Sequence, residues 1–439
     1  MNGNTNIVIS RCNIVDVKND CAVLRDMNIF IKQGKTVNVS PYREGENLSG
    51  YRIIDAKGLY AMPGFVNAHA HLFGTGAPSK ILSGGALQKI VLKLMRGPFG
   101  PVVLRALVRS SCVQELNSGV TTLRSLGDFR FTDIEVRDEI KKGKGRAAGL
   151  NLLVSGPAIT APGGHGDGTF AVTASTLSEF AALAEQNVSN GADIVKICVT
   201  GGVTDAKKKG EPGEVKMTEE QVAAVCERAH KLGKKVAAHV QSKRGVEIAV
   251  KGGVDTIEHG AHMSDEAAAL LKARGGAVVT TYTPAYPYFK LPPEITKLDE
   301  IRAYNSGVVL DEMTACAKQA YEVGITVGMG TDASCPFSTQ YGFWREIIYF
   351  AKLGGFGIKK ALVAATLGNA AVVGQSDSVG SIEAGKRGDV VLFEANPVET
   401  PYTLGNPLVV VAGGKVIDRP VVKRNVKMEK ILDELMEAM

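Results

Sequence analysis

The order of hydrophobic and polar positions changes twice along the chain. Up to about residue 60, apolar and polar residues alternate in short runs separated by glycine, asparagine and proline, which predicts short β-strands joined by turns. From Gly64 onward, apolar runs of about four to eight residues alternate with longer stretches in which apolar residues recur at helical spacing. After about residue 375 the short alternating pattern returns. The chain therefore has a central α/β part between two β-rich ends.

The central part repeats a strand followed by a helix. Such alternation implies parallel strands that are linked by helices. Eight strand–helix units over roughly 300 residues are typical of a (β/α)8 TIM barrel, so an α/β fold of this type is predicted. The predicted strands are residues 64–70, 120–126, 150–156, 193–200, 236–241, 255–260, 277–283 and 325–332.

The length of 439 residues exceeds what one compact core usually holds, so we expect two domains. The simplest arrangement pairs the two β-rich ends with each other and leaves the barrel as a long insertion. We therefore predict a small β-sandwich from residues 1–63 and 376–439, and a barrel from residues 64–375. The last stretch, residues 427–439, is amphipathic and is expected to be a helix that packs against the body.

The composition narrows the class of function. Hydrophobic residues make up 45% of the chain and charged residues 22%, as in ordinary globular proteins. The net charge of +6 is modest, and no stripe of lysine and arginine with interleaved aromatic residues indicates nucleic-acid binding. No apolar run reaches the roughly 18 residues of a membrane span. The seven scattered cysteines contain no C-x-x-C pair and the N-terminus lacks a signal-peptide pattern, so we expect reduced thiols in the cytoplasm.

Two histidines stand at the end of the first predicted barrel strand. His69 and His71 are spaced i, i+2, and side chains alternate between the faces of a strand, so both imidazoles point the same way. Such a pair can hold zinc, iron, nickel or copper, or it can form hydrogen bonds to loops instead. The residues at the other strand ends help to decide between these two interpretations.

Three further candidates lie at strand ends, where the catalytic groups of such barrels are found. His239 ends the fifth strand, His259 the sixth and Asp332 the eighth. Each has a structural explanation on its own, because a histidine can be satisfied in the core and an aspartate can cap the following helix. Their recurrence at one end of the barrel, together with His69 and His71, favours a shared metal site.

Lys196 is the only charged residue in the apolar run 194–199. An ammonium group in such a strand is costly to desolvate. Either the side chain reaches solvent at the end of the barrel, or burial lowers its pKa and the neutral amine takes up CO2. The resulting carbamate is an anionic oxygen ligand that can bridge two cations, which suits a site of four histidines and one aspartate.

These residues lie in segments that resemble a known family. PGFVNAHAHL, the strand with Lys196, AAHVQ, IEHG and GMGTD, in that order, resemble the metal-dependent amidohydrolase superfamily over nearly the whole chain. The segments DIVKICVTGGV, GGHGD and DTIEHGAHMSDE are similar to the branch that contains prolidase-like dipeptidases and imidazolonepropionase-like enzymes. The resemblance implies a metal-dependent hydrolase that cleaves an amide or peptide C–N bond.

The resemblance also implies two divalent ions, expected to be zinc, which share a hydroxide and a carboxylated lysine as bridges. The implied metal ligands are His69, His71, Lys196, His239, His259 and Asp332. The histidines of the first strand would hold the more buried ion, and those of the fifth and sixth strands the more exposed one. Asp332 would bind the buried ion and act as general base, accepting the proton of the attacking hydroxide and passing it to the leaving nitrogen.

Four residues are candidates for substrate binding. Prolidase-like relatives commonly carry a tyrosine two residues after the strand-five histidine, but this chain has Gln241, which can donate an amide hydrogen bond and departs from the dipeptidase pattern. His165, in the loop after the third strand, can bind a substrate carbonyl or carboxylate, or stabilise its own loop. Arg124 can meet a substrate carboxylate or pair with Asp128. Tyr282, in the proline-rich loop expected after the seventh strand, can form an aromatic wall or pack structurally.

Three functions remain open. The first is a binuclear hydrolase of a dipeptide, an N-acyl amino acid or a cyclic amide. The second is a mononuclear hydrolase or deaminase of the same superfamily, and Lys196 weighs against it because such enzymes generally lack the bridging lysine. The third is a non-enzymatic relative, which the loss of a metal ligand would mark, whereas all six are present. We expect a small-molecule substrate and a homo-oligomer.

Overall fold

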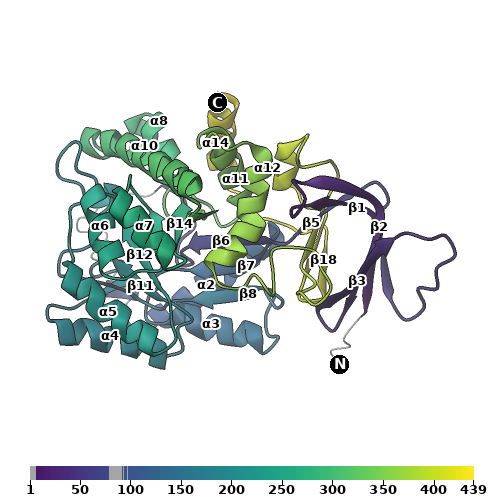
Figure 1. The fold of residues 1–439 in the computed structure, drawn as a ribbon, viewed down its shortest axis with the longest axis horizontal. Coiled ribbons are helices and arrows are strands. Elements are labelled where there is room, and N and C mark those ends of the chain that lie inside the picture. The colour runs from purple at the N-terminus through teal and green to yellow at the C-terminus, as the bar shows by residue number, and fades with distance from the viewer. Residues whose placement is uncertain (1–5, 79–90, 92, 96) are drawn as a thin grey trace.

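The computed structural model describes residues 6–78, 91, 93–95 and 97–439. Both ends of the chain contribute strands to one eight-stranded sheet (Figure 1). These strands are β1 (Ile7–Asp16), β2 (Ala22–Lys32), β3 (Lys35–Pro41), β4 (Arg52–Asp55), β5 (Tyr60–Pro63), β16 (Val390–Phe393), β17 (Val409–Ala412) and β18 (Lys415–Asp418). Their order is β18-β17-β16-β5-β1-β2-β3, with β4 paired to β1. The antiparallel pair of β5 and β16 joins the N-terminal strands to the C-terminal strands.

The two ends also share a hydrophobic core. Ile9 and Ile29 from the N-terminal strands belong to the same buried cluster as Val390 and Val411 from the C-terminal strands. Burial of apolar surface contributes about 25 cal/mol per Å², so this cluster stabilises the association of segments that lie far apart in the sequence. The two β-rich ends therefore pair with each other, as their sequence pattern predicts.

All eight predicted strands of the central part are present. They are β6 (Phe65–Ala70), β7 (Val120–Ser125), β8 (Asn151–Val154), β11 (Val195–Cys198), β12 (Val236–Val240), β13 (Thr256–His259), β14 (Ala277–Thr280) and β15 (Thr326–Met329). β6, β7 and β8 form one parallel sheet, and β11 to β15 run in order through a second one. Nearly every residue in these strands is buried, which explains their continuous apolar runs.

The edges of the two parallel sheets meet through backbone contacts. At the first edge, Ala70 at the end of β6 forms a parallel bridge with Ala333, just after β15. On the other side, the N–H of Asp193, just before β11, donates to the carbonyl of Val154 in β8 at 2.8 Å. The bridge between Ala70 and Ala333 brings the carboxyl ends of β6 and β15 together, although the two strands are far apart in sequence.

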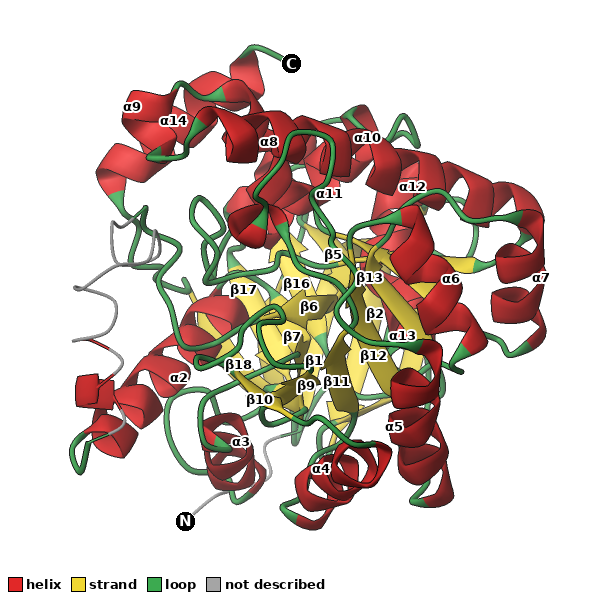
Figure 2. Cartoon of the chain, turned by 90° about the vertical axis from the view of Figure 1, so that its left-hand side faces the viewer, coloured by secondary structure: helices red, strands yellow, loops and turns green. Residues whose placement is uncertain are grey.

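Helices surround the central strands, as Figure 2 shows. They are α2 (Gly100–Asn117), α3 (Thr132–Lys141), α4 (Leu177–Ser189), α5 (Glu219–Lys231), α6 (Lys243–Lys251), α7 (Asp265–Ala273), α8 (Tyr282–Lys290), α9 (Pro293–Thr296), α10 (Glu300–Val323), α11 (Phe343–Lys352), α12 (Ile358–Val363) and α13 (Asn369–Val372). Thr176 and Thr218 begin α4 and α5 with capping boxes, and Ser242 and Ser264 cap α6 and α7. Each such cap is worth about 1 kcal/mol and fixes where a helix starts after its strand.

Helix α14 (Val426–Glu437) ends the fold. Its residues Met428, Leu432, Leu435 and Met436 are buried, so the amphipathic tail packs against the body as predicted. None of the helices in the described part of the chain combines the length and hydropathy that a bilayer span requires.

Two features of the fold differ from the sequence prediction. Short strands β9 (Ala158–Thr160) and β10 (Ala171–Thr173) flank the loop that carries His165 and extend the second parallel sheet. The segment after β14 forms helix α8 and not a proline-rich loop. Pro284 falls in the first turn of this helix, where its missing N–H costs nothing. The carboxylate of Glu346 in α11 accepts hydrogen bonds from the N–H groups of Tyr282 and Thr283 at 2.8 and 2.7 Å, which satisfies that turn.

Candidate functional site

The ends of β6 and β15 bring three predicted metal ligands together. The Nε2 atoms of His69 and His71 lie 3.5 and 3.2 Å from Oδ1 of Asp332. One ligand atom from each of the three residues lies within 4.8 Å of the others, and all three side chains are buried. The N–H of Asp332 donates to the carbonyl of His69 at 2.9 Å, which holds the two segments in register. Imidazole nitrogens and a carboxylate in this arrangement suit a divalent metal ion.

His239 and His259 extend this group from β12 and β13. Parallel pairing places His239 opposite Glu258 and Val240 opposite His259, so the two histidines lie one residue apart in the register of neighbouring strands. Their ring centroids are 4.6 Å apart, and the ring of His259 is 5.0 Å from that of His69. The structure therefore gathers all four predicted histidines at one end of the parallel strands.

The backbone at His259 is unusual and explains how this side chain reaches the site. Successive side chains of a regular strand point to opposite faces, and Thr256 and Glu258 share the inner face, because Oγ1 of Thr256 donates to Oε1 of Glu258 at 2.5 Å. His259 should then point outward. Its φ of 66° lies in the left-handed region instead and re-aims the imidazole inward. Asp332 has a φ of 50°, and backbone strain of about 1–3 kcal/mol at such residues is typical of functional sites.

Hydrogen bonds to Nδ1 orient three of the four imidazoles. Nδ1 of His69 lies 2.8 Å from Oε2 of Glu258, and Nδ1 of His71 lies 3.0 Å from the carbonyl of Gly127. Nδ1 of His259 lies 2.7 Å from Oγ1 of Thr281. An acceptor at Nδ1 leaves Nε2 free to bind a metal ion, which is the usual arrangement around metal-bound histidines. Nε2 of His239 lies 3.2 Å from the carbonyl of Gly201.

Lys196 is buried beneath this group, with an exposed fraction of 2%. Its Nζ has no hydrogen-bond partner among the described residues. Burial lowers the pKa of this lysine, although the charges of Glu258 and Asp332 oppose the shift. A buried amine without an acceptor is costly as an ammonium ion, so the structure favours a neutral or chemically modified amine here.

The ionisation states of the ligands suit metal binding. Burial, aided by the charge of Lys196, lowers the pKa of His69 to about 4. Burial also places the pKa values of His239 and His259 well below the usual range. Burial alone would raise the pKa of Asp332, but its hydrogen bond from His71 and the nearby histidine charges hold it well below the ordinary value. At neutral pH His69, His239 and His259 are therefore neutral imidazoles and Asp332 is an ionised carboxylate, the forms that bind metal ions.

Glu258 and Arg124 form a buried ion pair behind His69. Nη2 of Arg124 donates to Oε1 of Glu258 at 2.8 Å, and its Nε donates to the carbonyl of Ala68 at 2.5 Å. Pairing with Asp128, one of the two alternatives that the sequence left open for Arg124, does not occur, because Arg124 pairs with Glu258. Burial would raise the pKa of Glu258, but the charge of Arg124 and the hydrogen bond to His69 hold it well below its usual range. Because protein oxygens occupy its donors, Arg124 positions Glu258 and is not proposed as a substrate ligand.

The loop between β9 and β10 places His165 beside the metal-ligand group. Its ring stacks on that of His239, with centroids 4.3 Å apart and an interplanar angle of 12°. Nδ1 of His165 lies 2.5 Å from Oδ2 of Asp205, a residue that the sequence analysis did not single out. Oε1 of Gln241 accepts from the N–H of Val203 at 3.0 Å, which leaves its amide N–H groups as donors. His165 and Gln241 thus lie on the β11–β12 side of the site.

Tyr282 does not lie beside the predicted metal ligands. Its side chain is fully buried in α8, and its hydroxyl accepts a hydrogen bond from Oγ1 of Thr314 in α10 at 3.2 Å. Burial raises the pKa of this phenol above its usual range. The predicted contact of Tyr282 with the substrate is not supported, because α8 places the ring in the protein core.

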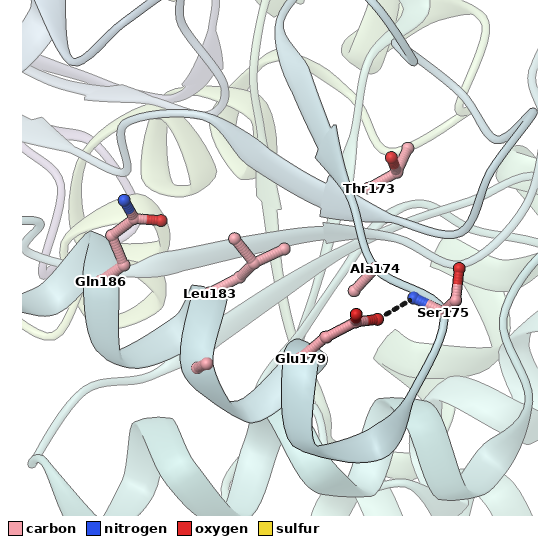
Figure 3. Close-up of a pocket in the computed structure, with 7 residues that line it drawn as sticks. Thr173, Ala174, Ser175, Glu179, Leu183 and Gln186 are labelled. Carbon is pink, nitrogen blue, oxygen red and sulfur yellow. Dashed lines mark hydrogen bonds between the residues drawn. The ribbon is translucent and has the colours of Figure 1, made fainter.

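A hollow of about 470 Å³ lies away from the metal-ligand residues. It is lined by the end of β10 and one face of α4, and Figure 3 shows Glu179 accepting a hydrogen bond from the N–H of Ser175 at its edge. This contact belongs to the start of α4, where Glu179 also completes the capping box. The hollow contains none of the predicted site residues, so it is not assigned to the catalytic centre.

The chain is similar in sequence to known proteins. The model of the Amidohydrolase family matches residues 60–423. The chain is 24% identical over 387 residues to ochratoxinase of Aspergillus niger, covering 82% of this chain and 76% of that protein. It is 27% identical over 435 residues to imidazolonepropionase of Symbiobacterium thermophilum, covering 92% and 93%.

Solved structures extend the comparison. A crystal structure of a Bifidobacterium longum protein, provisionally named a prolidase, is 34% identical, with a TM-score of 0.85 over 98% of this chain and 99% of that one. A Xaa-Pro dipeptidase with methionine bound in its active site is 27% identical, with a TM-score of 0.78 over 94% of this chain and 100% of that one. The chain therefore belongs to the amidohydrolase family, and it is a metal-dependent hydrolase that acts on C–N bonds.

Proposed function

We propose that the protein hydrolyses the amide bond of a dipeptide or an N-acyl amino acid, as prolidase-like enzymes do. The similarity to the Bifidobacterium longum protein and to the Xaa-Pro dipeptidase supports this substrate class. The methionine bound in the latter's active site further supports an amino acid as part of the substrate. The structural observation that carries the proposal is the buried Nζ of Lys196, which lacks a hydrogen-bond partner in the described part of the chain and lies close enough to His69, His239, His259 and Asp332 to interact with them electrostatically.

We propose that Lys196 is carboxylated and that two divalent ions, most suitably zinc, occupy the site. The carboxylated Lys196 would be a ligand to both ions. His69, His71 and Asp332 would hold one ion, and His239 and His259 the other. When bound, a pair of divalent ions lowers the pKa of a water molecule and stabilises the negative charge that develops on the substrate oxygen.

The residues of the chain supply the remaining steps. The ionised carboxylate of Asp332 can accept a proton from the attacking water and deliver it to the leaving nitrogen, because it lies at the centre of the histidine group. The free amide N–H groups of Gln241 can bind a substrate oxygen. His165, held by Asp205, can bind the end of the substrate on the same side. Binding at several points fixes the scissile bond relative to Asp332.

We further propose that the two parallel sheets form a single closed (β/α)8 barrel over residues 64–375. The backbone contacts at both seams support closure. The flanking segments 1–63 and 376–439 then form the β domain, and the joint sheet and core support that division.

A cyclic amide is the second candidate substrate. The similarity to imidazolonepropionase over 92% of this chain favours it. A lactam presents the same carbonyl and nitrogen to Asp332 as a dipeptide does, so the metal-ligand group alone does not separate the two. A mononuclear deaminase is less compatible, because it has no use for the buried Lys196.

The test is a substrate panel with the metal-loaded enzyme. Xaa-Pro and other dipeptides, N-acyl amino acids and small lactams are incubated separately, and the release of amine or ring opening is measured. We expect kcat/KM to be highest for a dipeptide or an N-acyl amino acid, and the Asp332→Asn variant serves as a control with the same fold. Turnover of lactams alone would replace the proposal by its alternative, and deamination without amide cleavage would refute both.

A further inference from the structure

Three phenylalanines stand beside the metal-ligand group, and we call them the aromatic cluster. Phe73 follows β6, Phe129 follows β7, and Phe170 precedes β10; all three are partly exposed. The rings of Phe73 and Phe170 are stacked, with centroids 5.7 Å apart and an interplanar angle of 20°. Phe129 meets Phe73 edge-on at 5.1 Å. Large aromatic side chains that remain partly exposed side by side often mark a binding surface.

The aromatic cluster is continuous with the catalytic centre. The ring of His71 lies 5.4 Å from that of Phe73 and 5.0 Å from that of Phe170. The ring of His165 lies 5.5 Å from Phe170 on the other side. An apolar surface therefore runs from a metal ligand toward the residue that we place at the substrate.

Two glycines make room for the ring of Phe170 in the aromatic cluster. Gly127 and Gly166 both have left-handed φ values, 109° and 77°. A Cβ at these positions would come within 2.9 and 2.7 Å of the Phe170 ring. Only glycine allows this ring to lie so close to both loops, so Gly127 and Gly166 together determine where the Phe170 ring can lie.

We propose that the aromatic cluster is a specificity subsite that receives the apolar side chain of an amino-acid substrate. The inference rests on the proposed function, because it assigns one side chain of the amide substrate to this surface. Transfer of a leucine, methionine or phenylalanine side chain from water to such a surface is favourable in proportion to its apolar area. A negatively charged side chain would lose hydration there and would face the electron-rich surfaces of the rings.

Free amino acids test the subsite without requiring turnover. Calorimetry with the metal-loaded enzyme measures Kd for L-phenylalanine, L-leucine, L-alanine and L-aspartate. We expect phenylalanine and leucine to bind at least about tenfold more tightly than alanine, and aspartate to bind most weakly. Equal affinities, or the absence of binding by all four amino acids, would overturn the proposal.

Two variants localise the preference. Phe129 is chosen because its ring contacts Phe73 and none of the histidines among the described ring pairs. In Phe129→Ala the preference for leucine over alanine should fall at least about threefold, whereas Phe129→Leu should keep most of it. An unchanged preference in Phe129→Ala would refute the assignment.

Phe356 provides a matched control, because it is a partly buried ring that stacks on Phe350 at 4.5 Å in another part of the fold. Phe356→Ala should lower stability and leave the ratio of affinities unchanged, and a changed ratio would contradict the proposal. Failure of the proposed function is a separate result. It would appear as selective binding of apolar amino acids without hydrolysis of any peptide or N-acyl amino acid.

Discussion

Nδ1 of His69 lies 2.8 Å from Oε2 of Glu258, so a carboxylate on β13 orients a histidine on β6 that we propose as a metal ligand. Both side chains are buried. The other carboxylate oxygen of Glu258, Oε1, forms an ion pair with Arg124 on β7. These contacts connect β6, β7 and β13 beneath the proposed metal site. A buried ion pair of this kind is costly to break, because the remaining partner is left as an uncompensated charge.

Replacing Glu258 with glutamine should weaken metal binding. The amide can still accept a hydrogen bond from His69 but carries no charge, so Arg124 is left unpaired and the imidazole loses its anionic partner. Loss of such supporting groups typically costs 10–100-fold in metal affinity or activity. Competition with a chelator measures the affinity, and the melting temperature of the metal-free protein measures stability separately.

Glu429→Gln is the matched control for this variant. Glu429 pairs with the buried Arg345 at 3.2 Å between α14 and α11, and it does not contact the metal ligands. The Glu429→Gln variant should be less stable than the wild type and should bind metal with the same affinity. Equal metal affinity in Glu258→Gln and wild type would show that Glu258 has a structural role only.

Lys196→Ala should lose metal and activity together. The variant removes the amine that would carry the carbamate, and the histidines alone then lack a shared anionic ligand. Short carboxylic acids should restore part of both properties, because they can supply the missing oxygens. Metal content and kcat, measured with and without acetate or propionate, check this. Full activity in the variant without added acid would exclude a carbamate.

Asp332→Asn should abolish most turnover while most of the metal ligands remain. General acid–base groups contribute roughly 10²–10⁴-fold, so kcat should fall by at least that range. If Asp332 served only as a helix cap, the variant would lose about 1 kcal/mol of stability and keep a normal kcat. Measurements of kcat, metal content and melting temperature on this variant distinguish the two roles.

The stability of the protein should depend on the ionisation of Glu115. This residue of α2 is fully buried, and burial raises its pKa from 4.5 to about 8, although a hydrogen bond from Asn67 opposes the shift. Between these two values the folded state binds a proton that the unfolded chain has lost. The resulting stability is present below about pH 4.5 and is lost as the pH rises through about 8.

The Glu115→Gln variant tests this relationship, because a neutral amide of the same shape does not titrate. From about pH 5 to about pH 8.5, the melting temperature should fall less in the variant than in the wild type. If the melting temperatures of the wild type and the variant fell equally with pH, Glu115 would not titrate in this range.

Much of the architecture follows from hydrophobic periodicity. The apolar strands of the central part begin and end within three residues of their predicted positions, because their burial on both faces leaves a continuous apolar run. The histidines and Asp332 come together as predicted, because parallel strands align their carboxyl ends. Such arguments need only local sequence and the direction of each strand.

Other features depend on contacts that local sequence does not encode. The contact of Glu258 with His69 does not follow from the sequence pattern, because alternation along a strand assigns Glu258 and His259 to opposite faces, and the left-handed φ of His259 removes that restriction. Asp205 meets His165 across 40 residues of chain. Helix α8 forms in a proline-rich segment because Glu346, from a distant helix, satisfies its first turn.

The central claim is a pair of divalent ions bridged through Lys196, and the metal-to-protein ratio tests it most directly. The enzyme is produced with zinc and bicarbonate, freed of loosely bound metal, and analysed by elemental mass spectrometry alongside its rate of amide hydrolysis. We predict about two ions per chain in the fully active enzyme. Full activity with a single ion per chain would contradict the account and leave Lys196 without the role assigned to it.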